Sequence, residues 1–252
     1  MPELQVAGIR AHYVHRAPVR VGTAPVVFVH GAGGSHQHWL YQVRDLPGVP
    51  TFALDLPGHG QSAGPGRDSI QGYAGWLVAF LDAVGVDRAI LAGHSMGGAI
   101  ALHVALHDPA RVAGLALIAT GARLRVAPGL RDAIRQDFAA AIGLMGEWVY
   151  GPDADPAVVR LGLRQLEAAG PDVLSGDFAA CDGFDVMDRL GEIGAPTLVM
   201  CGTLDRMTPT KYSTFLRDGI RGASLHLVEG AGHMLMVEKP AAVARALASL
   251  AP

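Results

Sequence analysis

The chain has 252 residues, of which half are apolar and 17% are charged, and its formal net charge is −3. Such an apolar fraction excludes an intrinsically disordered chain, and the length allows a core large enough to fold without disulfides or metals. The slightly acidic balance leaves no electrostatic footprint for nucleic acid or an anionic membrane. Glycine accounts for 33 residues without a collagen repeat, which indicates many turns and close backbone approaches.

The sequence shows neither a secretion signal nor a membrane segment. Residues 1–10 carry polar and charged side chains where a signal peptide needs an apolar run. No stretch reaches 18 uninterrupted apolar residues. Two cysteines, Cys181 and Cys201, are too few for a disulfide framework. We therefore expect a soluble cytoplasmic protein that binds neither membrane nor nucleic acid.

Short apolar runs alternate with stretches of helical periodicity along most of the chain. The runs predict strands at 25–30, 51–54, 89–92, 112–119, 197–201 and 224–228. The periodic stretches predict helices at 69–85, 99–107, 210–219 and 239–250. This alternation is typical of a parallel sheet with right-handed crossovers, and the nearly continuous apolar runs predict helices on both faces. The first twenty residues alternate weakly and are compatible with an antiparallel hairpin at one edge.

The alternation stops between residues 122 and 193, where no good strand pattern is found. Helical patterns at 130–142 and 157–169 are interrupted by glycine and proline. An insertion of this length between two sheet strands predicts a helical cap. We therefore expect one α/β core domain, formed by residues 1–121 and 194–252, that is interrupted by a cap at residues 122–193.

A candidate nucleophile, Ser95, stands between the strand at 89–92 and the helix at 99–107. It is the centre of a Gly-x-Ser-x-Gly motif that runs from Gly93 to Gly97. A serine on a sharp strand-to-helix turn has its hydroxyl exposed, and the flanking glycines remove side chains that would clash. The helix N-terminus adds free N–H groups and a positive partial charge. The alternative is an ordinary turn that happens to contain a serine.

A base and an acid stand in the loops after two later strands. His233 follows the strand at 224–228, and Asp205 follows the strand at 197–201. The carboxyl ends of parallel strands share one edge, so both loops should lie beside Ser95. A serine hydroxyl needs a base to remove its proton, and the chain order Ser95, Asp205, His233 is known for triads on such sheets.

Asp205 has an alternative interpretation as an acid at a helix start that pairs with Arg206. In either case Thr208 is a plausible N-cap and Pro209 the first helical residue. Some hydrolases place the acid one strand earlier, but residues 119–122 contain no carboxylate. That absence favours Asp205.

Backbone N–H groups of an oxyanion hole would stabilise the negative charge that develops in acyl transfer. One donor should be Met96, the residue after the nucleophile, and the other should come from the loop after the first core strand. We expect Ala32 to be that second donor, with Gly33 as the second choice. His30 is expected to orient this loop.

Taken together, these motifs resemble the α/β-hydrolase fold family over essentially the whole chain. The motifs are the loop after His30, the segment 55–62 (Asp-Leu-Pro-Gly-His-Gly-Gln-Ser), the serine motif, the loop 202–205 and Gly232-His233. The resemblance implies an eight-stranded, mostly parallel sheet with helices on both faces and an inserted helical cap. It also implies a Ser–His–Asp triad that works without metal or cofactor.

Within that family the chain looks like the small capped carboxylesterases and enol-lactonases. Serine at position 95 sets aside the epoxide hydrolases and haloalkane dehalogenases, which use aspartate. The run Gly33-Gly34-Ser35 differs from the Gly-Pro-Gly usual in carbon–carbon bond hydrolases, and Ala32-Gly33 differs from the Phe and Pro of haloperoxidase-like enzymes. The sequence therefore favours an esterase or lactonase over both of these subgroups.

The expected function is cleavage of carboxylic esters or lactones of small, mainly apolar molecules through an acyl-enzyme on Ser95. The alternatives are a carbon–carbon hydrolase or a haloperoxidase or perhydrolase of the same fold, and a hydrolase-fold ligand-binding receptor with little turnover. A monomer or homodimer is compatible with the sequence. Candidate pocket residues in the cap, each of which is also a candidate for cap core, are Phe138, Leu144, Met145, Trp148, Val149, Phe178, Phe184 and Met187. Arg123 and Arg125 are candidates for binding a substrate carboxylate, although we favour solvated side chains.

Overall fold

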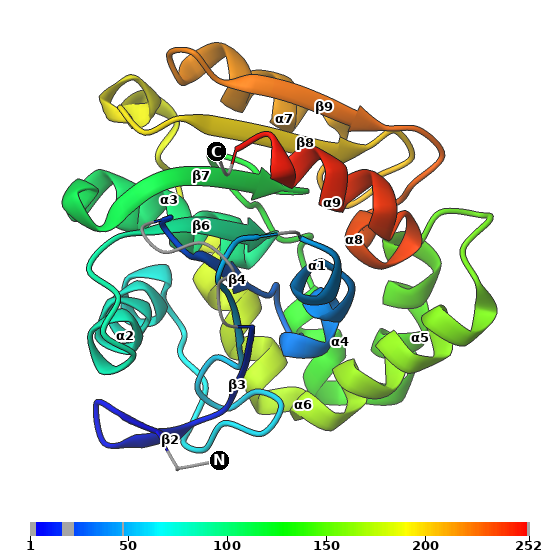
Figure 1. Cartoon of the computed structure of the whole chain (residues 1–252). Helices are drawn as coiled ribbons and strands as arrows, with labels where there is room; N and C mark the ends of the chain where they lie inside the picture. Colours follow the sequence, from blue (N-terminus) through cyan, green and yellow to red (C-terminus); the bar gives the residue numbers. More distant parts are fainter. Residues whose placement is uncertain (1–3, 17–22, 47, 251–252) are drawn as a thin grey trace.

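The computed structural model describes residues 4–16, 23–46 and 48–250, so residues 1–3, 17–22, 47 and 251–252 of the predicted core domain lie outside the described residues. The main element is a seven-stranded sheet of order β3-β5-β4-β6-β7-β8-β9 (Figure 1). Only β3 is antiparallel to its neighbour, and the other pairs are parallel. The strands are β3 (Tyr13–Arg16), β4 (Val26–Val29), β5 (Thr51–Leu54), β6 (Ala89–His94), β7 (Val112–Ile118), β8 (Thr197–Gly202) and β9 (Ser224–Val228).

The sequence prediction of a mostly parallel α/β sheet is confirmed, with a different arrangement at the N-terminal edge. Strands β1 (Leu4–Val6) and β2 (Ile9–Ala11) pair with each other in a separate antiparallel hairpin and do not extend the main sheet as an eighth strand. The turn between them contains Ala7 and Gly8 at positive φ. The predicted edge hairpin is thus divided between β1–β2 and the antiparallel edge strand β3. Residues 17–20 of that prediction lie outside the described residues.

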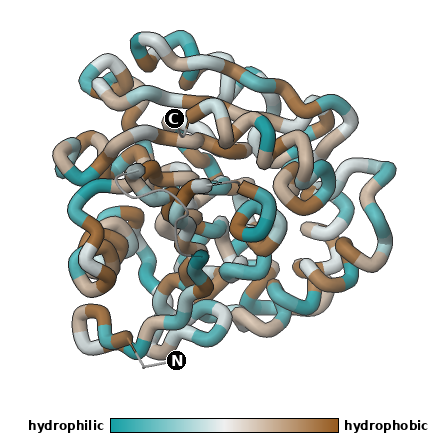
Figure 2. Tube along the Cα trace, in the orientation of Figure 1, coloured by the Kyte–Doolittle hydropathy of each residue, from teal (hydrophilic) through white to brown (hydrophobic). Residues whose placement is uncertain are grey.

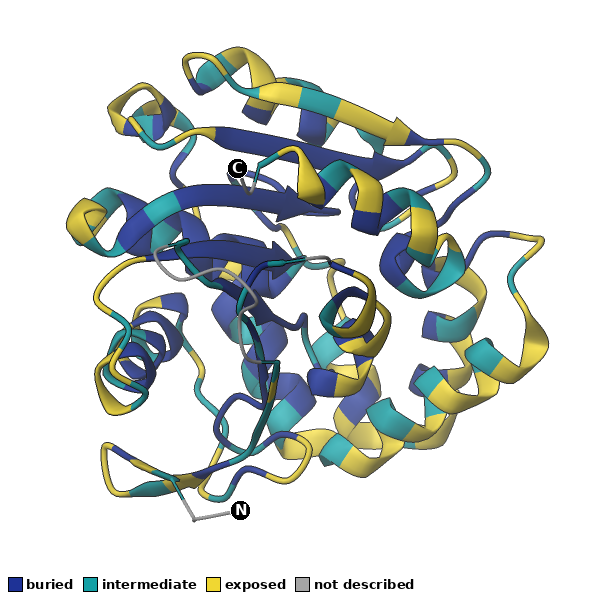
Figure 3. Cartoon of the chain, in the orientation of Figure 1, coloured by how far each residue is buried: buried dark blue, intermediate teal, exposed yellow. Residues whose placement is uncertain are grey.

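Alternating strand residues pack into two cores, one on each face of the sheet. Val27 and Val29 of β4 pack into one core, and Val26 and Phe28 pack into the other. The first face is covered by α2 (Ile70–Ala83), α3 (Met96–His107) and α7 (Thr210–Gly219). The second is covered by η1 (His36–Trp39), α1 (Leu40–Asp45), α8 (Leu235–Glu238) and α9 (Pro240–Ala248). The central strands are therefore hydrophobic and buried along their length (Figures 2 and 3).

Three helices, α4 (Leu130–Gln136), α5 (Phe138–Val149) and α6 (Pro156–Asp182), form a helical insertion between β7 and β8. The predicted single helix at 130–142 is wrong, because Asp137 interrupts it and caps α5 by accepting the Ala140 N–H. The predicted helix at 157–169 continues to Asp182 through a kink at Gly170. This glycine has a φ of 80° and is followed by Pro171. A small core of its own holds the insertion together.

The strand order determines where a ligand crevice forms on the sheet. From β4 the chain forms β5 on one side and then crosses to β6 on the other. The loops after β4 and β6 therefore diverge and leave a crevice at the carboxyl ends of the strands, where ligands bind in open α/β sheets. Short 3₁₀ turns, η2 (Pro109–Arg111) and η3 (Met187–Glu192), complete the connections. No helix in the described part of the chain is long and apolar enough to cross a membrane.

Candidate active site

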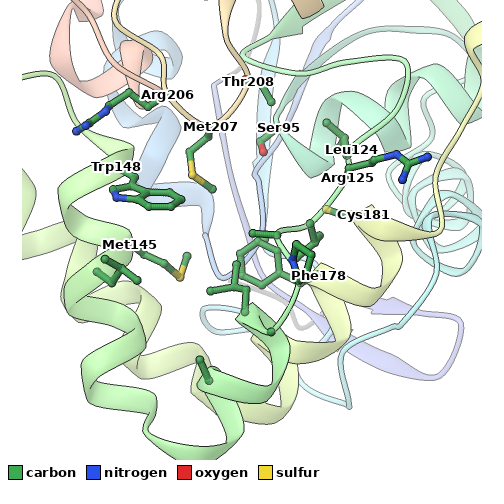
Figure 4. Close-up of a pocket in the computed structure, with 18 of the residues that line it drawn as sticks. Ser95, Leu124, Arg125, Met145, Trp148, Phe178, Cys181, Arg206, Met207 and Thr208 are labelled. Atoms are coloured by element: carbon green, nitrogen blue, oxygen red, sulfur yellow. The ribbon is translucent and has the colours of Figure 1, made fainter.

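Ser95 lies in a strained turn between β6 and α3. Its φ of 51° and ψ of −116° are rare for a residue with a side chain. A Cβ at Gly93 would collide with the Gly97 backbone, and one at Gly97 would collide with the carbonyl of Val29. Both glycines are therefore required for the turn, which leaves Ser95 half-buried with its hydroxyl pointing into a cavity (Figure 4).

His233 and Asp205 meet at the carboxyl ends of β9 and β8. His233 Nδ1 donates to Asp205 Oδ2 over 2.9 Å, and both side chains are buried. A neutral ring that donates from Nδ1 has its lone pair on Nε2, which is the arrangement needed in a general base. Burial alone would raise the pKa of Asp205, but the charge and hydrogen bond of His233, together with donors from Thr208, lower it overall.

The segment after Asp205 holds this carboxylate in place. The N–H groups of Met207 and Thr208 both donate to Oδ1 at 2.9 Å, and the Thr208 hydroxyl donates to Oδ2 at 2.9 Å. Thr208 is thus not the N-cap that the sequence suggested, because its hydroxyl is used by Asp205. Pro209 is the N-cap and not the first helical residue, since α7 begins at Thr210. Arg206 does not pair with Asp205, since it donates to the carbonyl of Glu147.

Ser95 and His233 line the same small cavity. Among the hydrogen bonds of the described residues, none joins the Ser95 hydroxyl to His233. Such bonds commonly tighten only when substrate is bound. The backbone around His233 is fixed, because its N–H donates to the carbonyl of Val149 and its carbonyl accepts from His94 Nε2.

The hydrogen bonds of the loop after β4 distinguish Ala32 from Gly33 as a candidate oxyanion donor. Within the described residues, the N–H groups of Ala32 and Met96 donate to no other group. The N–H of Gly33 donates to Asp177 Oδ2 over 2.8 Å, so Gly33, the second choice, is already committed. His30 orients the loop as expected: its Nε2 accepts from the Leu56 N–H and its Nδ1 donates to the Gly31 carbonyl.

Asp177 of α6 is a buried carboxylate that sequence reasoning missed. Besides Gly33, it accepts from the Tyr73 hydroxyl at 2.5 Å and from His59 Nε2 at 2.8 Å. His59 Nδ1 donates to the carbonyl of Pro57, so both ring nitrogens donate and the ring is an imidazolium. Burial lowers the pKa of His59, but the charge and hydrogen bond of Asp177 raise it overall.

Glu238 of α8 is a second carboxylate that sequence reasoning missed. It accepts the N–H groups of Gly151 and Gly232 at 3.0 Å and that of Met234 at 3.1 Å. These bonds fix the loop around His233 and join it to the segment between α5 and α6 of the helical insertion. A Glu two residues before a proline carries no sequence signal for such a role.

A cavity of about 460 Å³ opens from Ser95 beneath the helical insertion (Figure 4). Of the predicted pocket residues, the structure brings Leu144, Met145, Trp148 and Phe178 together there, and Val149 lines the adjoining small cavity. The other three predictions are corrected, because none of these residues lines either cavity. Phe184 and Met187 pack on the core under α3, and Phe138 packs within the insertion.

Of the arginines near the site, Arg125 and Arg206 are exposed and Arg123 is half-buried. Arg123 forms a salt bridge of 3.5 Å with Asp185. Arg125 and Arg206 lie at the rim of the large cavity, and their guanidinium groups turn away from Ser95 in Figure 4. The geometry therefore agrees with solvated side chains and gives no carboxylate clamp at the serine.

Away from Ser95, the donor atoms of His12, His36 and Asp55 lie within 4.8 Å of one another, a spacing that a metal ion can bridge. Asp55 already accepts from the N–H and the Nδ1 of His36 at 2.6 and 2.9 Å, and from the Gln61 N–H at 2.9 Å. A cation would have to replace these hydrogen bonds. We therefore interpret the cluster as support for the loops after β4 and β5.

A serine turn, a histidine and an aspartate at the carboxyl edge of a parallel sheet define the α/β-hydrolase class of fold. The model of the alpha/beta hydrolase family matches residues 26–246, and the chain belongs to that family.

Relatives of known name are consistent with this class. The chain is 36% identical over 236 residues to the dihydrolipoyllysine-residue acetyltransferase component of the acetoin cleaving system of Pseudomonas putida, which covers 86% of this chain and 60% of that protein. The chain thus spans less than two thirds of that relative. It is 31% identical over 224 residues to the pimeloyl-[acyl-carrier protein] methyl ester esterase of Neisseria meningitidis, covering 82% and 85% of the two chains. A thermophilic esterase structure superposes with a TM-score of 0.85 at 30% identity, covering 97% and 94%. These findings support a hydrolase.

Proposed function

We propose that the protein is a serine hydrolase that cleaves carboxylic ester or lactone bonds of small, mainly apolar molecules. The observation that carries the proposal is the strained φ of 51° at Ser95, beside a buried His233–Asp205 pair. Strain of this kind costs about 1–3 kcal/mol and persists where function requires it. The unused N–H groups of Ala32 and Met96 lie on the two loops from which an oxyanion hole is built.

In the proposed reaction, Ser95 Oγ attacks the ester carbonyl while His233 Nε2 takes its proton. The carbonyl oxygen becomes an oxyanion that accepts from Ala32 and Met96. His233 then gives the proton to the departing alcohol, which leaves an acyl group on Ser95. A water that is deprotonated by His233 releases the acid, and Asp205 stabilises the imidazolium in both halves.

The helical insertion would serve as the cap that shapes the substrate site. Its helices supply apolar walls to the large cavity, and none of the described side chains that line this cavity is a carboxylate. The surroundings favour neutral, apolar acyl groups, because an unpaired charge buried there would be costly.

The test uses ethyl butyrate, with acid release followed in a pH-stat, and a fluorophosphonate probe. We expect wild-type turnover and one covalent adduct on Ser95, and both should be lost in Ser95→Ala with unchanged circular dichroism. Ser249→Ala, which changes an exposed serine after α9, is the matched control. Wild-type turnover by Ser95→Ala would refute the proposal. Ligand-induced stabilisation without turnover would favour a receptor.

A further inference from the structure

We propose that the protein selects esters of short alcohols, such as methyl or ethyl esters, whose longer acyl chain lies in the large cavity. This inference deepens the proposed function and rests on it. It fixes which side of the ester is small, and the serine mechanism alone leaves that open.

Two cavities of unequal size meet at Ser95. The large one has a volume of about 460 Å³ and the small one about 50 Å³. Both are lined by Ser95 and Ala32, and Met145, Phe178 and Met207 complete the shared wall. A carbonyl attacked by Ser95 and held by Ala32 would therefore sit at the junction, with one arm of the ester in each cavity.

The position of His233 decides which arm enters which cavity. His233 lines the small cavity and is absent from the lining of the large one. In acyl transfer, the histidine that deprotonates the serine also protonates the leaving oxygen. The leaving oxygen must therefore lie beside His233, and the alkyl group attached to it must enter the small cavity.

The volume of the small cavity limits that alkyl group. A single water needs about 10–15 Å³ of such volume, so 50 Å³ accommodates roughly three to five water-sized groups. Methyl, ethyl and propyl groups meet this limit, whereas longer chains exceed it. The large cavity falls within the range of about 300–1,000 Å³ usual for small-molecule sites and has room for a medium acyl chain.

The walls of the small cavity are packed tightly. Tyr150 is buried, and its hydroxyl abuts Gly162 so closely that a side chain there would collide with it. His38 is buried, and burial lowers its pKa to about 4, so the ring is neutral and adds no charge to the wall. Leu166 of α6 also lines the cavity. A longer alcohol would have to displace these groups.

The large cavity has an apolar outlet. Trp148 and Leu144 on α5 line it while 44% and 49% exposed. An acyl chain that outgrows the cavity would pass along these side chains toward solvent. The site should therefore tolerate longer acyl groups while it rejects longer alcohols.

Two isomeric esters test the assignment with the wild-type protein. Methyl octanoate and heptyl acetate have the same atoms and differ in which side of the ester is short. Acid release in a pH-stat should give a kcat/KM for methyl octanoate at least about tenfold higher, the discrimination that apolar pockets achieve. Equal or higher kcat/KM for heptyl acetate would overturn the inference and leave the serine mechanism standing. If the protein cleaves neither of these esters nor ethyl butyrate, the proposed function itself is overturned.

A pair of wall variants sharpens the assignment. Leu166→Ala enlarges the small cavity and should raise the ratio of kcat/KM for butyl over methyl octanoate by about tenfold. Leu144→Ala, at the outlet of the large cavity, is the matched control and should leave that ratio within about twofold of wild type. An unchanged ratio in folded Leu166→Ala, checked by circular dichroism, would contradict the position of the alcohol.

Discussion

Replacement of Asp177 by asparagine should destabilise the protein through a single buried charge. Asp177 accepts from the Gly33 N–H, the Tyr73 hydroxyl and His59 Nε2. Asparagine keeps the shape of the side chain and one acceptor oxygen, but it removes the negative charge beside a protonated His59. The substitution therefore isolates the charge from the packing.

The burial of the Asp177–His59 pair determines how much free energy of unfolding the substitution removes. The side chains of Asp177 and His59 are both 0% exposed, and removal of one partner of a buried pair costs about 3–5 kcal/mol. His59 can release its proton and the amide oxygen can still accept from Gly33, so we expect the lower end, about 3 kcal/mol. In a chain of this size, that lowers the melting temperature by about 6–12 °C.

Thermal denaturation of the full chain at pH 6 measures this loss. The matched control is Asp185→Asn, since Asp185 forms an exposed salt bridge with Arg123 at 3.5 Å. An exposed pair contributes at most about 1 kcal/mol, so the control should melt within about 4 °C of wild type. An Asp177→Asn protein that melts as close to wild type as the control would refute the reasoning.

The pH dependence of the difference in melting temperature between wild type and Asp177→Asn gives an independent check. The folded-state pKa of His59 is raised, so the stability that the pair contributes is fully present below the unfolded pKa of about 6.5. It is lost as pH rises through the folded pKa. The gap in melting temperature between wild type and Asp177→Asn should therefore shrink as pH rises, and a gap that widened would contradict a protonated His59.

Three further predictions concern the loops that carry the site. Gly97→Ala places a methyl group against the Val29 carbonyl and should cost about 1–3 kcal/mol, measurable by urea unfolding; an unchanged midpoint would show that the turn can relax. Glu238→Gln weakens three charge-assisted bonds and should cost about 2 kcal/mol and lower kcat, whereas the exposed Glu229→Gln should change neither. The pKa of Asp205 is lowered in the folded protein, so its carboxylate contributes stability above about pH 4 that is lost as pH falls through the folded pKa. The unfolding free energy of Asp205→Asn should therefore depend less on pH in this range than that of wild type. Parallel pH dependences of the two proteins would contradict the lowered pKa.

The strands and the serine turn could be predicted because local sequence determines them. The apolar run at 51–54 became β5 with the same bounds, and the run at 224–228 became β9. Ser95 stands out because Gly93 and Gly97 are required by backbone contacts within one βα unit. Parallel topology then predicts that loops far apart in sequence meet at one edge.

Asp177 and Glu238 could not be predicted because their roles depend on tertiary contacts alone. In sequence, Asp177 is one acidic residue in a polar helical stretch, where a solvated carboxylate is the usual case. Only the packing of α6 against the loop after β4 shows that it takes the Gly33 N–H. The same contact occupies the Gly33 N–H and so favours Ala32, the first choice from the sequence, as the candidate oxyanion donor.

The contacts of the helical insertion make it more than a cover for the site. Asp177 fixes the loop that carries Ala32, and the carbonyl of Val149 accepts the N–H of His233. Glu238 further joins the His233 loop to Gly151 at the end of α5. The insertion thus holds both the candidate oxyanion loop and the candidate base. A displacement of the insertion as a whole would break these bonds and disturb both groups together. Substrate entry should therefore require local movement at the Trp148 outlet and not opening of the whole insertion.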